Sequence, residues 1–107
     1  MNTRIKGNRI QRKCIELLED EGFLVDKVEK TGKFQKQKDL FGLFDLIAIK
    51  PDVVRLVQVT CNRPHTHKEY LEFSKHYPIA SCYQYVWLDR KGWKTFWYVG
   101  GKKLVLK

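Results

Sequence analysis

The chain has 107 residues, 43% of them hydrophobic, which is enough for one hydrophobic core and too little for two, so we expect a single domain over residues 1–107. No apolar run approaches the roughly 18 residues of a membrane span and no signal-like apolar segment follows the polar start, which excludes a membrane partner and favours a soluble, cytoplasmic protein. A formal net charge of +9 favours a polyanionic partner, and three cysteines without CxxC spacing argue against a disulfide framework.

The first half of the chain predicts a helix, a strand and a hairpin. Apolar residues recur at helical spacing from Asn8 to Glu21, and Gly22 is well placed to end that helix. Residues 23–28 are typical of a strand, and a loop rich in glycine and lysine follows over residues 31–38. Two β-branched runs, residues 44–49 and 55–60, then flank a turn at residues 51–52 and predict a hairpin.

The second half predicts another helix and three strands. Thr66, with Glu69 three residues later, has the pattern of a capping box, and the helix should end at about Tyr77, before Pro78. Residues 83–88 and 93–99 predict two strands around a turn, and residues 102–107 a short last one. Their aromatic residues most simply fill the core or a dimer interface, with base stacking as the alternative. The order αβββαβ with a β extension indicates an α/β (α+β) mixed sheet.

Polar side chains interrupt the predicted hairpin. Asp45 stands at the mouth of the first strand, and alternation puts Gln58 and Thr60 on the face opposite their valine neighbours. A turn at residues 51–52 sets Asp45 across from Gln58 or Val59, so that three polar groups converge. This layout is typical of a metal-nuclease site. The structural alternatives are a strand-end acid paired with a lysine, a buried amide satisfied by the sheet, and an ordinary strand threonine.

Several segments, taken in chain order, resemble the PD-(D/E)XK nuclease superfamily, and archaeal Holliday junction resolvases in particular. The resemblance covers nearly the whole chain and depends on the order of the segments more than on any one of them. It implies a restriction-endonuclease-like core, metal-dependent cleavage of DNA and a homodimer. It is carried by Lys6-Gly7, residues 17–23, Phe44-Asp45-Leu46-Ile47-Ala48, Leu56-Val57-Gln58-Val59-Thr60, residues 71–74 and Gly92-Trp93.

The chain departs from this family's catalytic pattern at three positions. The family has a glutamate in the first helix where this chain has Gln11, a second acid in place of Gln58 and a lysine in place of Thr60; only Asp45 matches outright. The resemblance implies that Asp45, the amide oxygen of Gln58 and the carbonyl of Val59 hold Mg²⁺, with Mn²⁺ as a substitute, while Thr60 positions a water.

Residues outside the motif offer replacements for the missing groups. Asp39 could restore a second carboxylate, although an aspartate in a solvated turn is the simpler interpretation. Lys36 or Lys38 could take the place of the missing lysine. Gln11 is a candidate site residue or part of a solvated helix face. Cys61, His65 and His67 could bind zinc, but no fourth ligand is evident.

Basic residues form three blocks, which together favour a nucleic acid because lysine and arginine clusters bind phosphates with little regard to sequence. A merely solvated basic surface is the alternative for any one block. His65 and its basic neighbours precede the second predicted helix, where phosphate contact is expected. The candidate nucleic-acid-binding residues are Arg4, Lys6, Arg9, Arg12, Lys30, Lys33, Lys36, Lys38, Arg63, His65 and Lys68.

The leading hypothesis is therefore a magnesium-dependent endonuclease that cuts branched or otherwise structured DNA. The main rival is a DNA-binding protein that has kept the nuclease fold and basic surface but lost or weakened the chemistry, which the residues at 11, 58 and 60 favour. An RNA-binding module fits the charge but lacks an RNP or GXXG signature.

Overall fold

Two helices and a six-stranded sheet make up the protein in a computed structural model that describes residues 3–28 and 43–106, with side chains from Asn8 onward. The elements are α1 (Thr3–Asp20), β1 (Leu24–Lys27), β2 (Leu46–Lys50), β3 (Val53–Cys61), α2 (Lys68–His76), β4 (Ser81–Leu88), β5 (Gly92–Val99) and β6 (Lys102–Leu106). Their kinds and order confirm the predicted mixed α/β architecture. The first helix begins five residues before the predicted start.

The strands lie side by side in the order β1-β2-β3-β4-β5-β6. Every neighbouring pair is antiparallel except β3 and β4, which run parallel. A parallel pair needs a crossover connection, and α2 supplies it here. The hairpin predicted to turn at residues 51–52 is confirmed, because Lys50 pairs with Val53.

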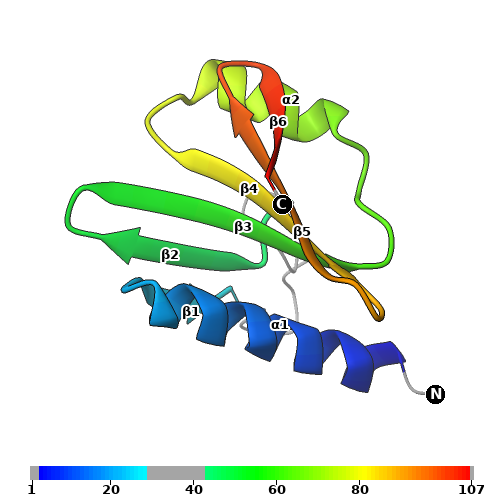
Figure 1. Cartoon of the computed structure of the whole chain (residues 1–107). Helices are drawn as coiled ribbons and strands as arrows, with labels where there is room; N and C mark the ends of the chain where they lie inside the picture. Colours follow the sequence, from blue (N-terminus) through cyan, green and yellow to red (C-terminus); the bar gives the residue numbers. More distant parts are fainter. Residues whose placement is uncertain (1–2, 29–42, 107) are drawn as a thin grey trace, which may run out of the picture.

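The two helices lie on opposite faces of the sheet (Figure 1). Helix α1 packs on β1 and β3, whereas α2 packs on β4, β5 and β6. Within residues 3–28 and 43–106, no helix is long and apolar enough to cross a membrane.

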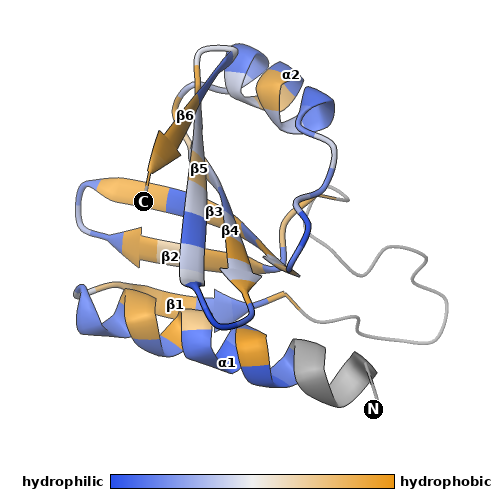
Figure 2. Cartoon of the chain, turned by 45° about the vertical axis from the view of Figure 1, so that its right-hand side comes forward, coloured by the Kyte–Doolittle hydropathy of each residue, from blue (hydrophilic) through white to orange (hydrophobic). Residues whose placement is uncertain are grey.

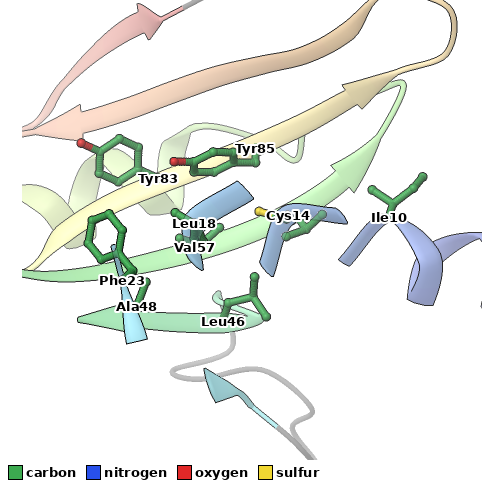
Figure 3. Close-up of a cluster of buried hydrophobic side chains, with 10 residues drawn as sticks. Ile10, Cys14, Leu18, Phe23, Leu46, Ala48, Val57, Tyr83 and Tyr85 are labelled. Carbon is green, nitrogen blue, oxygen red and sulfur yellow. The ribbon is translucent and has the colours of Figure 1, made fainter. Parts of the chain in front are cut away.

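The core under α1 follows from the periodicity of that helix. Ile10, Cys14 and Leu18 are buried against Val57 and other residues of the sheet, with the aromatic rings of β4 beside them (Figure 3). Hydrophobic segments of α1 recur among hydrophilic ones along the helix (Figure 2), as an amphipathic helix on a sheet requires. The predicted end of α1 is confirmed by Gly22, whose φ of 98° suits glycine in a helix C-terminal motif.

A second cluster, formed by Phe44, Leu56, Tyr70, Cys82, Val86, Phe96 and Tyr98, fills the space under α2. The predicted capping box at Thr66 is wrong, because His67 is the N-cap of α2 and makes no side-chain capping bond. Its ring instead bonds the Tyr98 hydroxyl, with Nδ1 at 2.6 Å, and packs on Phe96. Packing of His67 into the core thus sets the start of the helix one residue later than its local sequence suggests.

Candidate metal and nucleic-acid site

Asp45 occupies a bend just before β2 and takes over the end of the ladder between β2 and β3. Its N–H donates to the Val57 carbonyl at 2.8 Å, as in a regular antiparallel pair. The next bond is made by its side chain, because the Val59 N–H donates to Asp45 Oδ2 at 3.1 Å. The carboxylate is therefore fixed against the backbone of β3 at the mouth of the hairpin, where the sequence placed it.

Gln58 and Thr60 lie on the α2 face of β3, opposite Val57 and Val59, which belong to the core under α1. Both polar side chains are buried, with relative exposures of 4% and 9%. The amide nitrogen of Gln58 lies 3.5 Å from the Val59 carbonyl oxygen. Since the N–H of Val59 binds Asp45, the carboxylate and the amide both contact the backbone of one residue, Val59.

The same two side chains carry buried oxygens without a hydrogen-bond partner among the described residues. These atoms are Oε1 of Gln58 and Oγ1 of Thr60, and Oε1 of Gln11 on α1 shares the property. Burying an oxygen without a partner costs about 1–3 kcal/mol, so native proteins rarely keep such atoms without a reason. Both positions on β3 coincide with residues that the sequence marked for function.

The Asp45 carboxylate also lies near α1. Its charge adds to burial, the larger cause, in raising the pKa of the Cys14 thiol above its usual range. Cys14 stands one turn beyond Gln11 on the same helix, which places Gln11 at the same end of the sheet. The structure thus groups Asp45, Gln58, Val59 and Thr60 directly and sets Gln11 nearby.

This donor set fits a hard cation weakly. One carboxylate with amide and carbonyl oxygens matches the ligand types of Mg²⁺, which takes one or two protein carboxylates and keeps several waters. The partnerless Oε1 of Gln58 is the observation that favours such a ligand. Among the described residues, no three His, Cys, Asp or Glu side chains lie close enough together to hold a metal ion on their own. Cys61, His65 and His67 therefore do not form the zinc site that the sequence left open.

The described basic candidates flank the same end of the sheet. The segment that follows β3 carries two of them, Arg63 and His65, and both are exposed. Lys68 is exposed at the start of α2. Arg9 and Arg12 are exposed on α1, whose Lys13 lies 4.2 Å from the ring centroid of Trp87 near the end of β4. Candidates outside the described residues are Asp39, Lys30, Lys33, Lys36 and Lys38, and the side chains of Arg4 and Lys6 are likewise not described.

A buried polar chain that the sequence analysis missed holds the segment after β3. Gln84 is fully buried, donates from Nε2 to the Tyr98 hydroxyl at 2.8 Å, and accepts from the backbone N–H of His65. Burial raises the pKa of Tyr98 to about 12, so its hydroxyl keeps its proton, and the same hydroxyl is hydrogen-bonded to Nδ1 of His67. The signal in the sequence was a lone amide between two strand tyrosines.

Comparisons with known proteins give a match in structure. No protein-family model and no curated protein sequence matches the chain. Among solved structures, the chain is similar to Hjc of Archaeoglobus fulgidus, a Holliday junction resolvase from an archaeal hyperthermophile. The TM-score is 0.61 at 21% sequence identity, over 84% of this chain and 75% of that one. The match shows that the chain shares the fold of that protein, as the sequence resemblance implied.

We predict that Thr60→Val stabilises the protein by about 1 kcal/mol, because valine keeps the shape of the side chain and removes a buried hydroxyl without a partner. Urea unfolding of the variant beside wild type measures the change. Thr66→Val, at an exposed position, serves as the control and should leave stability unchanged. A marked loss of stability in Thr60→Val would mean that the hydroxyl is bonded in the folded protein.

We also predict that stability declines on acidification through His67. Burial first, and then the charges of Lys103 and Lys94, lower the pKa of His67 below its ordinary 6.5. The unfolded chain therefore binds this proton more tightly, and the free energy of unfolding falls as the pH drops below about 6.5. Unfolding at about pH 8 and about pH 5.5 measures the fall. It should shrink in His67→Gln and persist in His76→Gln; equal behaviour of the two variants contradicts the assignment.

Proposed function

We propose that this protein is a metal-dependent DNA endonuclease of the resolvase type, acting on branched or structured DNA. One observation carries the proposal: the Asp45 carboxylate and the Gln58 amide both bind the backbone of Val59, at the end of β2 and β3. The fold shared with an archaeal Holliday junction resolvase supports the same conclusion.

Each residue of this group has a role in the proposal. Asp45 would supply the single anionic ligand for Mg²⁺ or Mn²⁺, and Gln58 and Val59 would supply neutral oxygens. A bound ion would lower the pKa of an attacking water and neutralise charge on the phosphate. Thr60 would accept a hydrogen bond from that water and orient it. Because Thr60 brings no positive charge, we expect slow cleavage.

DNA is held through its phosphates. Exposed basic residues beside the site contact the backbone without reading sequence, namely Arg9, Arg12, Arg63, His65 and Lys68. Gln11 lies at the same end and touches the DNA near the cleaved bond. By analogy with the family, two copies act together, because two symmetric cuts require two sites.

A second function is favoured by one specific observation. Position 60 carries a buried, uncharged side chain, and Gln58 beside it is uncharged as well. Asp45 is then left as the one carboxylate of the described site, and its Oδ2 already accepts a hydrogen bond from the backbone. In this alternative the protein binds structured DNA without cutting it.

We predict that Asp45→Asn abolishes cleavage of an end-labelled four-way junction, with at least about a hundredfold loss of rate, because the one anionic ligand is removed. Asparagine keeps an oxygen to accept the Val59 N–H, so folding and DNA binding should persist. The assay uses Mg²⁺, Mn²⁺ or EDTA, with duplex and single strands as competing substrates. Asp52→Asn, in the exposed turn at the far end of the hairpin, is the matched control. Salt-sensitive binding without cutting in any metal would establish the second function.

We predict that the double substitution Gln58→Glu with Thr60→Lys raises cleavage by about tenfold or more, because it restores the second anionic ligand and the missing cation. Single-turnover rates on the same junction measure the gain. Circular dichroism and urea unfolding must show a folded variant, since position 60 is buried. A folded double variant without a gain would contradict the assignment of these positions.

A further inference from the structure

The sheet face that carries α1 also holds a cavity away from the proposed metal site. Helix α1 covers β1 and β3, and the rest of this face, over β4, β5 and β6, lies beside it. A cavity of about 450 Å³ opens between Leu17 of α1 and these strands. Its floor is a row of register partners on three adjacent strands, namely Tyr85, Thr95 and Leu106. This volume suits a small organic ligand.

Three polar groups meet at one wall of this cavity. Arg55 Nη1 donates to the Tyr85 hydroxyl at 3.0 Å and lies 3.7 Å from Oε1 of Glu21. Burial raises the pKa of Tyr85 to about 12, so the hydroxyl stays protonated. Because its oxygen already accepts from Arg55, its own proton is left to donate. The wall thus presents a hydroxyl donor and a carboxylate acceptor side by side.

Aromatic rings hold this polar wall in place and line the cavity. The Arg55 guanidinium lies 4.1 Å from the ring centroid of Tyr83 and 4.6 Å from that of Phe23. Trp93 meets Tyr85 edge to face at 6.0 Å and forms part of the lining. Tyr83 and Tyr85 both project from β4 toward the side of α1 that carries Cys14 and Leu18 (Figure 3).

The side chains that line the cavity limit the kinds of ligand that it can bind. An aliphatic ligand would leave the Tyr85 proton desolvated without a partner, which is costly. An anionic ligand would be repelled by the Glu21 carboxylate, and a cationic ligand would be repelled by the Arg55 guanidinium. Because these two charges balance each other, the cavity favours a ligand without net charge. A neutral, planar ring with an acceptor and a donor on one edge satisfies both polar groups and stacks on aromatic side chains.

We infer that this cavity is a binding pocket for a single unstacked nucleobase. The aromatic lining supplies stacking, the Tyr85 hydroxyl donates to a ring nitrogen or carbonyl, and Glu21 accepts from an amino or imino group of the base. The net charge of +9 favours nucleic acid as the source of the base. The inference goes beyond the proposed cleavage, since it uses neither Asp45 nor a metal.

Neutral nucleosides test the pocket, because they carry no phosphate for the basic surface to attract. Adenosine, guanosine, cytidine and uridine are titrated into the full-length protein by NMR, following the indole N–H signals. We expect saturable binding of at least one nucleoside, with a Kd of about 0.1–1 mM. Tyr85→Phe should weaken it by about tenfold, as the loss of a buried hydrogen bond predicts.

Tyr98→Phe is the matched control, because it removes a phenol that is equally buried and hydrogen-bonded but lies under α2. It should leave nucleoside affinity unchanged. Absence of saturable binding by all four nucleosides overturns the inference, as does an equal loss in the two variants. It is also overturned if toluene or ribose 5-phosphate binds as tightly as the best nucleoside. Each of these outcomes leaves the nuclease proposal standing, because Asp45 takes no part in them.

Discussion

The hydrogen bond from the Val59 N–H to the Asp45 carboxylate is the contact on which the candidate site depends. It ends the ladder between β2 and β3 with a side chain instead of a backbone carbonyl. An acid held in this way is fixed in position by the backbone of β3. Gln58 and the Val59 carbonyl then stand beside it because they belong to the same stretch of β3.

Much of this arrangement could be predicted from the sequence, because strand alternation and a short turn are local properties. The turn at residues 51–52 fixes the register of the hairpin and so places Asp45 across from Gln58. The face on which Gln58 and Thr60 lie follows from the period of two along a strand. The start of α2 could not be predicted, because packing of His67 against Phe96 and Tyr98 overrides the local capping signal. Tertiary packing alone brings Arg55, Glu21 and Tyr85 together, so no local sequence pattern predicts the cavity that they line.

The uncharged residues at positions 58 and 60 affect DNA binding and phosphodiester hydrolysis differently. Phosphate contacts need only exposed cations near the end of the sheet, and the segment after β3 supplies them. Hydrolysis needs anionic oxygens and a positive charge close to the reacting phosphate, and here Asp45 alone provides a charge within the described group. In the proposed site, uncharged residues at positions 58 and 60 would lower the affinity for a metal ion. The fold itself accommodates both side chains inside the sheet.

The single parallel pair in the sheet has a consequence for how the protein folds. Strands β1, β2 and β3 form one antiparallel meander, and β4, β5 and β6 form another, so each half can assemble through contacts between neighbouring hairpin strands. Within the sheet, the halves are joined by the pairing of β3 with β4, which requires closing the long connection through α2. Closing such a loop carries an entropic cost that the hairpins avoid. Gln58 pairs with Gln84 across this seam, so the strand that carries the candidate site becomes an interior strand only when the two halves join.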